Sequence, residues 1–200
     1  MKYRSILWLN GLCLLIVITL LAYTKYINPL AGALFMPPHF PNSLTEGLLT
    51  NIFQLLCAVP PLICAFSFIV LKKIAPQNKN NRFIFYSALV TLGFLMNEKY
   101  RIHIIFLADF GIPKFLTIVV YALIGLYYGI TFRREIIKST PYVLLLIGLG
   151  LLISGIFVDL LHLGSSSSSP LEGIPKLFSG INVALYYWLI CYKEVVNSFK

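Results

Sequence analysis

Charged side chains are scarce in this 200-residue sequence, and acidic ones especially so. Asp, Glu, Lys and Arg make up 12% of the residues, and only seven of these are acidic, whereas soluble globular domains contain about 25% charged residues. Hydrophobic residues account for 58% of the chain, and its mean hydropathy is +0.84. The shortage of charge excludes a water-soluble globule, and 14% aromatic residues with long aliphatic runs exclude a disordered chain. The composition therefore predicts an integral membrane protein.

The sequence also lacks the short motifs that mark common catalytic and cofactor sites. It contains no HExxH zinc motif, no P-loop, no GxSxG nucleophile elbow and no CxxCH haem attachment. Its four cysteines, Cys13, Cys57, Cys64 and Cys191, all fall inside apolar stretches rather than in outer loops. We therefore expect no disulfide framework and interpret these cysteines as small packing residues.

Six apolar stretches are long enough to cross a hydrocarbon core of about 30 Å as helices. They cover residues 5–23, 48–71, 83–106, 115–132, 142–161 and 177–192. We predict an all-α integral membrane protein with one domain over 1–200, whose six transmembrane helices form three helical hairpins. The segment 27–43 is apolar but interrupted by four prolines, so we expect it to lie on the outer membrane surface rather than to span the bilayer.

Basic residues indicate the orientation of these hairpins. The segments 72–82 and 131–140 are short, polar and basic, and if both face the cytoplasm, so do both termini. That arrangement places 11 of the 16 Lys and Arg residues on the cytoplasmic side, as the positive-inside rule requires. We therefore predict a multi-pass protein of a bacterial cytoplasmic membrane or its equivalent. The net charge of +9 is then an insertion signal, and no nucleic-acid partner is expected.

A four-residue sequence occurs twice in the second half of the chain. Gly111–Lys114 and Gly173–Lys176 both read GIPK, at a spacing of 62 residues. The identity indicates an internal repeat of two hairpins, although hairpins of similar length also arise because the bilayer fixes helix length. Proline favours the first helical turn, so Pro113 and Pro175 are expected to start the fourth and sixth helices. Alternatively, the sixth helix starts at the capping-box sequence Ser169–Glu172, which leaves Pro175 inside it.

Histidines and carboxylates gather on the predicted outer side. Glu98, Arg101 and His103 occur near the end of the third predicted helix, and Asp159 and His162 occur three residues apart near the end of the fifth. A carboxylate and an imidazole at this spacing share a helix face and can bind one metal ion, or the carboxylate can simply orient the histidine. Glu98, His103, Asp159 and His162 are therefore our candidate ligands for a divalent metal and our candidate catalytic residues.

Four residues are candidates for binding an anionic substrate or lipid headgroup: Arg101, Lys114, Glu172 and Lys176. Both lysines are predicted beside helix amino ends, where free N–H groups and the helix dipole favour an anion. The alternatives are structural. The lysines then extend to the membrane interface, and Glu98 and Arg101 form an ion pair that holds helices together.

Two classes of function fit these features. The first is a non-catalytic membrane component, namely a subunit, assembly factor or small transporter, which has membrane lipids and other membrane proteins as partners. The second is an intramembrane metal-assisted hydrolase or transferase that acts on a lipid-linked substrate. We favour the first class because every catalytic assignment needs contacts between helices that a sequence does not reveal.

Overall fold

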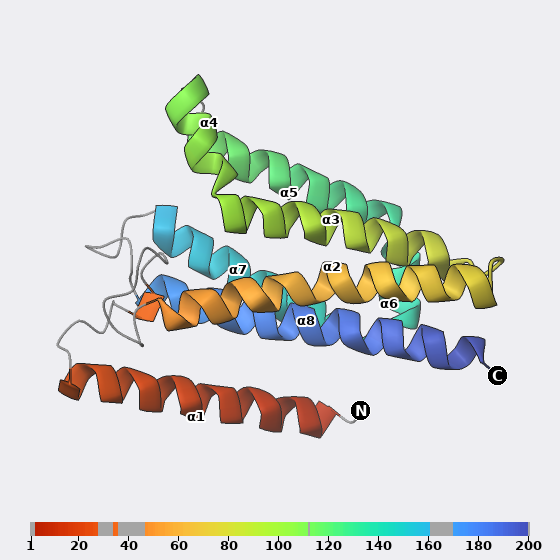
Figure 1. Cartoon of the computed structure of the whole chain (residues 1–200), viewed down its shortest axis with the longest axis horizontal. Helices are drawn as coiled ribbons and strands as arrows, with labels where there is room; N and C mark the ends of the chain where they lie inside the picture. Colours follow the sequence, from red (N-terminus) through yellow and green to blue (C-terminus); the bar gives the residue numbers. More distant parts are fainter. Residues whose placement is uncertain (1–2, 28–33, 36–46, 112, 161–169, 200) are drawn as a thin grey trace. The chain divides into compact units, whose positions relative to one another are not determined.

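The computed structural model shows a chain built almost entirely from helices (Figure 1). It describes residues 3–27, 34–35, 47–111, 113–160 and 170–199; 92% of these residues are helical and none of them forms a strand. The helices of this described part are α1 (Tyr3–Ile27), α2 (Leu48–Ile74), α3 (Asn80–Tyr100), α4 (Ile102–Phe110), α5 (Lys114–Thr131), α6 (Arg133–Ser139), α7 (Tyr142–Leu160) and α8 (Pro170–Ser198).

Four of these helices are long and apolar enough to cross a membrane. The spanning segments are Ile6–Tyr26 of α1, Leu48–Ile74 of α2, Tyr142–Asp159 of α7 and Pro170–Ser198 of α8. The apolar helix at Phe115–Thr131 is shorter. Large apolar side chains such as Leu7 and Trp8 are 72% and 73% exposed, which suits a surface that faces lipid rather than water. The all-helical class and the membrane location predicted from the sequence are thus supported.

The helix expected over residues 83–106 is interrupted, and the prediction of one continuous helix there is wrong. Arg101 has left-handed backbone angles (φ 49°, ψ 47°), so α3 ends at Tyr100 and α4 begins at Ile102. The Arg101 carbonyl then accepts a hydrogen bond from Ile104 N at 2.7 Å, in the first turn of α4. Neither Gly nor Pro marks the break. Its local setting is the polar run 97–101, and α4 packs against α5 beyond it.

The last helix begins earlier than the apolar stretch 177–192 suggests. α8 starts at Pro170, the first-turn proline of the alternative start, and Pro175 lies inside the helix. The expectation that Pro175 starts this helix is therefore wrong. In contrast, Pro113 directly precedes α5, and its carbonyl accepts a hydrogen bond from Leu116 N at 2.9 Å. Pro60 and Pro61 are both accommodated within α2, which continues through them.

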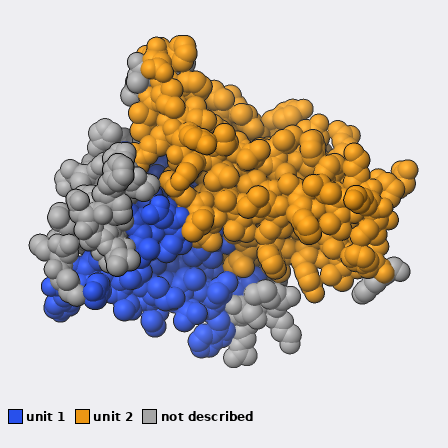
Figure 2. Space-filling view, in the orientation of Figure 1, with its two compact units in different colours: residues 1–53, 147–181 blue, residues 54–146, 182–200 orange. Residues whose placement is uncertain are grey.

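The chain divides into two compact units, which Figure 2 colours separately. The first unit consists of residues 1–53 and 147–181, and the second consists of residues 54–146 and 182–200. The predicted surface segment 27–43 belongs by sequence to the first unit. Apart from Ile27, Leu34 and Phe35 it lies outside the described residues, so its position on the membrane surface stays a prediction.

Two close approaches organise the first unit. At Gly155 of α7, a Cβ atom would lie 2.9 Å from Lys176 Cγ and 3.1 Å from the Glu172 carbonyl oxygen, so α8 approaches α7 closely at a residue without a side chain. At Gly173 of α8, a Cβ atom would overlap the ring of Phe35. Glycine is required at Gly173 because the ring occupies the space of a side chain.

An aromatic cluster forms the core of the second unit. The rings of Phe83 on α3, Tyr128 on α5 and Phe132 have centroids 5.4–6.1 Å apart, within the range of favourable aromatic pairs. Phe83 is 2% exposed, and Tyr186 of α8 is fully buried. These contacts hold α3 and α5 side by side (Figure 1).

Candidate functional site

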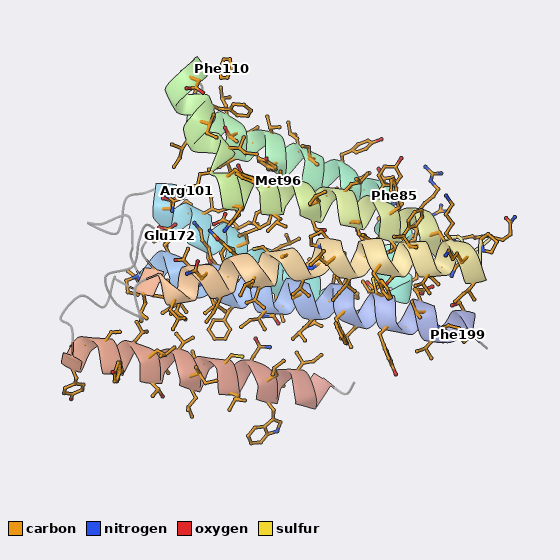
Figure 3. The ribbon with its side chains drawn as sticks, viewed as in Figure 1. Phe85, Met96, Arg101, Phe110, Glu172 and Phe199 are labelled. Carbon is orange, nitrogen blue, oxygen red and sulfur yellow. The ribbon has the colours of Figure 1, made fainter. Side chains whose placement is uncertain are left out.

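The polar end of α3 is joined to α2 within the second unit. Lys99 Nζ donates a hydrogen bond to Gln54 Oε1 at 3.3 Å, and the Gln54 residue is 9% exposed. Glu98 lies close enough to Cys57 of α2 to interact with it electrostatically. Figure 3 shows Arg101 at the turn between α3 and α4. Since α3 ends before Arg101, the helical spacing that suggested a Glu98–Arg101 pair does not apply.

The candidate residues of the first unit lie on α7 and α8. Asp159 is the next-to-last residue of α7 and is partly buried. Glu172, labelled near the start of α8 in Figure 3, forms a salt bridge with Lys176, with Nζ and Oε1 2.5 Å apart. Their side chains are 20% and 19% exposed. The ammonium group of Lys176 thus already has a carboxylate partner one helical turn away.

The two candidate lysines differ in their position on a helix. Lys114 is the first residue of α5, as predicted. Lys176 lies six residues beyond the start of α8, so the expectation that it stands beside a helix amino end is wrong. The backbone N–H groups around Lys176 are used by the helix itself. Lys114 does stand at a helix amino end, but its side chain lies outside the described part, so its role in binding an anion stays a prediction.

No group of three or more His, Cys, Asp and Glu side chains in the described residues could hold a metal ion. His162 and the side chain of His103 lie outside the described part of the chain. Glu98 and Asp159 are described, but they belong to different units. The metal and catalytic roles of Glu98, His103, Asp159 and His162 therefore stay predictions, as do the substrate-binding roles of Arg101, Lys114, Glu172 and Lys176.

Three buried hydroxyl groups that the sequence did not single out are brought together in the second unit. Ser87 of α3 is fully buried, and its Oγ lies 2.6 Å from Tyr128 Oη of α5. Tyr128 Oη in turn lies 3.5 Å from Tyr187 Oη of α8. We call Ser87, Tyr128 and Tyr187 the hydroxyl chain. It connects three helices. Ser87 and Tyr128 are 41 positions apart in the sequence, and Tyr128 and Tyr187 are 59 positions apart.

The hydroxyl chain has a defined direction. Ser87 Oγ donates its single proton to the Phe83 carbonyl oxygen at 2.7 Å, so it can only accept from Tyr128. Tyr128 has then used its own proton, so only Tyr187 can donate across the 3.5 Å between the two phenol oxygens, a separation at the long limit of a hydrogen bond. The order of donation is Tyr187 to Tyr128 to Ser87 to the backbone of α3. Each hydroxyl proton is thereby placed, which is the arrangement that makes buried polar groups tolerable in an apolar setting.

Two further hydrogen bonds connect the turns of the second unit to α8. Thr140, which follows α6, donates to the Ile136 carbonyl oxygen, so its Oγ1 accepts from Tyr186 Oη at 3.2 Å. Asn78, in the turn between α2 and α3, donates through Nδ2 to Glu194 Oε2 at 3.3 Å. The polar side chains of this unit thus join neighbouring helices and turns to one another.

The sequence carries a weak signal for these residues. Ser87, Tyr128 and Tyr187 are hydroxyl groups inside apolar helices, where a polar side chain needs a partner. The candidates predicted from the sequence were charged residues and histidines, so they did not include these three residues. The pairing itself depends on which helices are neighbours, which the sequence does not state.

Comparison with known protein families assigns the chain to a family. Residues 11–189 match the family described as a domain of unknown function, DUF8692. No curated protein and no solved structure matches the chain. The family match covers nearly the whole sequence and both compact units, and the protein therefore belongs to the DUF8692 family.

Proposed function

We propose that the protein spans the membrane six times, as three helical hairpins with both termini in the cytoplasm. In addition to the four long apolar helices, α3 has 21 residues and α5 has 18, or about 32 and 27 Å at 1.5 Å per residue. These lengths suit a hydrocarbon core of about 30 Å. Membrane lipids then cover the exposed apolar side chains.

The charges of the second unit support this orientation. Exposed cations occupy the end of α2, the turn that follows it, the start of α3, helix α6, and the end of α8: Lys72, Lys73, Lys79, Arg82, Arg133, Arg134, Lys138 and Lys193. The Asn78–Glu194 hydrogen bond places the α2–α3 turn beside the carboxy-terminal part of α8. Both belong on the cytoplasmic side of the proposed topology.

Cysteine labelling tests the topology. Gln77 and Asp109 are both exposed and lie at opposite ends of α3 and α4. A membrane-impermeant maleimide added to intact cells should label Asp109→Cys but not Gln77→Cys, and inverted vesicles should give the opposite result. Labelling of Gln77→Cys from outside would overturn the proposed orientation.

We propose further that the protein is a non-catalytic membrane component, a subunit or assembly factor in preference to a small transporter. The hydroxyl chain is the observation that carries this proposal. It uses buried polar groups to fasten α3, α5 and α8 to one another. Hydrogen bonds between membrane helices contribute about 0.6–2 kcal/mol each, so this network favours one fixed arrangement of helices, which a scaffold for partner proteins needs.

Removing a single hydroxyl group tests the role of the chain. Tyr128→Phe keeps the aromatic ring but removes the central oxygen, and Tyr127→Phe is the matched control because Tyr127 is 74% exposed. We expect Tyr128→Phe to lower the melting midpoint of the purified protein, by about 2–4 °C for each kcal/mol by which the free energy of unfolding falls. Tyr127→Phe should leave the midpoint unchanged, and equal midpoints for the two variants would contradict the fastening role.

Native mass spectrometry and metal analysis of protein gently extracted from its membrane test the function class. A subunit or assembly factor should carry partner proteins at fixed stoichiometry, and Glu98→Gln or Arg101→Gln should reduce their recovery. Near-stoichiometric divalent metal that is lost in Asp159→Ala/His162→Ala would instead favour the metal-assisted hydrolase or transferase acting on a lipid-linked substrate. That result would overturn the non-catalytic proposal.

A further inference from the structure

Two thiol groups from distant parts of the sequence meet in the second unit. Cys64 of α2 and Cys191 of α8 are separated by 127 positions, yet their Sγ atoms lie 3.8 Å apart. Each residue is 1% exposed. Ser67, one turn beyond Cys64, also hydrogen-bonds to the Cys191 thiol. Both cysteines are free thiols in this structure.

The two sulfur atoms are in van der Waals contact but are not bonded. A disulfide needs a separation of about 2.05 Å, so the sulfurs must approach by roughly 1.8 Å. Side-chain rotation and a slight adjustment of two packed helices supply a movement of this size. Cys57 offers a useful contrast, since it lies seven residues before Cys64 on the same helix, about 10 Å away along the axis.

We propose that Cys64 and Cys191 form a redox modification site that closes to a disulfide under oxidation by a hydroperoxide. One sulfur attacks a peroxide oxygen, the O–O bond breaks, and a sulfenic acid and one molecule of water or alcohol form. The second thiol attacks the sulfenic sulfur, the S–O bond breaks, and water leaves as the S–S bond forms. Two thiols lose two electrons and two protons in total, and the peroxide is reduced.

Burial selects the class of oxidant. The pair is inaccessible to bulky disulfides and enzymes, whereas hydrogen peroxide is small and uncharged and can permeate packed protein. The adjacent thiol also decides the product. A sulfenic acid next to a thiol condenses to a disulfide, which prevents irreversible oxidation to the sulfinic acid.

The disulfide would connect α2 covalently to α8. It would close a loop of more than a hundred residues and restrict the unfolded chain. We therefore expect the oxidised protein to melt roughly 5–10 °C above the reduced protein, given about 2–4 °C per kcal/mol for a chain of this size. Dithiothreitol applied during partial unfolding should return the midpoint to its reduced value.

Mass spectrometry of the full-length protein tests the site. Membrane vesicles are treated with hydrogen peroxide, dissolved in SDS with N-ethylmaleimide, and analysed as intact protein and as peptides. The reduced protein, with its four free cysteines, should take four adducts, and the oxidised protein should take two and contain a cross-link between the Cys64 and Cys191 peptides. Cys57→Ser should form the same cross-link, because Cys57 is not part of the pair.

Three results would overturn the proposal. The first is retention of all four adducts at a peroxide dose that oxidises a reporter thiol enclosed in the same vesicles. The second is a cross-link that joins other cysteines. The third is loss of two adducts in Cys64→Ser after the same treatment, because Cys191 then has no partner. Peptide mapping of the wild type decides the question even where a serine variant folds poorly.

Discussion

The two copies of the GIPK sequence adopt different structures, although their four residues are identical. The first copy, Gly111–Lys114, connects α4 to α5, and its proline directly precedes a helix. The second copy, Gly173–Lys176, lies wholly inside α8. The difference comes from the residues upstream. α8 starts at Pro170, three residues before the second copy, whereas the first copy follows the end of α4. The same tetrapeptide therefore has no fixed structure of its own.

The glycines of the two copies are needed for different reasons. Gly111 has a φ of +66°, which side chains other than glycine rarely adopt, but the space around it is open. Gly173 is helical, but the ring of Phe35 fills the place of its side chain. Gly111 is thus needed for its backbone conformation, and Gly173 is needed because it has no Cβ atom.

Among the substitutions that test this comparison, Gly173→Ala should have the largest effect on stability. The new methyl group would overlap the Phe35 ring, and such overpacking costs about 1–3 kcal/mol, so we expect a clear fall in the melting midpoint in detergent. Gly150→Ala on α7 is the control, because nothing lies within 4 Å of its Cβ position. Phe35→Ala combined with Gly173→Ala should recover part of the loss. A midpoint for Gly173→Ala equal to that of Gly150→Ala would contradict this role.

Gly111→Ala should have a somewhat smaller effect, because only the backbone is strained. A left-handed conformation costs an L-residue about 1–2 kcal/mol. Gly111→Asn should cost less than Gly111→Ala, since Asn tolerates this conformation. The measurement is again the melting midpoint of the purified variants. The same midpoint for Ala and Asn would mean that the positive φ is not the reason for glycine at this position.

Pro175→Ala should stabilise the protein, whereas Pro113→Ala should have little effect. Alanine at Pro175 restores one backbone N–H within α8, and an added hydrogen bond contributes about 1 kcal/mol. Pro113 precedes α5, where no helical bond is gained. Chemical denaturation of both variants checks the contrast. A gain in stability for Pro113→Ala as large as that for Pro175→Ala would remove the difference between the two prolines.

Lys176→Met should have the smallest effect. Methionine keeps an unbranched side chain beside Gly155 and removes the ammonium group that pairs with Glu172. A partly exposed pair one helical turn apart contributes only about 0.3–0.5 kcal/mol. We expect a small loss of stability at low salt that disappears at high salt. A loss that is unchanged by salt would show that the packing of the lysine stem, and not its charge, stabilises this turn.

The sequence predicted the long helices better than their interruptions. Apolar runs placed the helices near residues 5–23, 48–71 and 142–161 within a few residues of α1, α2 and α7, because burial in lipid rewards an unbroken apolar stretch. It did not predict the break at Arg101, which has no Gly or Pro to signal it. α8 starts at Pro170, whereas hydrophobicity alone suggested residue 177.

The candidate site was less predictable, for a related physical reason. The sequence shows which residues can ionise, and it indicated Glu98, Asp159 and their neighbours on that basis. It does not show which helices are adjacent. The hydroxyl chain and the pair of thiols join residues 41 to 127 positions apart, and no local pattern encodes such contacts.

The fixed direction of the hydroxyl chain has a consequence for the evolution of the family. Tyr187, Tyr128 and Ser87 each donate to the next oxygen, and Ser87 donates to the backbone. Loss of the central oxygen leaves the buried Tyr187 hydroxyl without its acceptor, at a cost of about 1–3 kcal/mol, whereas Ser87 keeps its bond to the Phe83 carbonyl oxygen. Family members with phenylalanine in place of Tyr128 are therefore expected to have replaced the Tyr187 hydroxyl as well, so that these two positions change together.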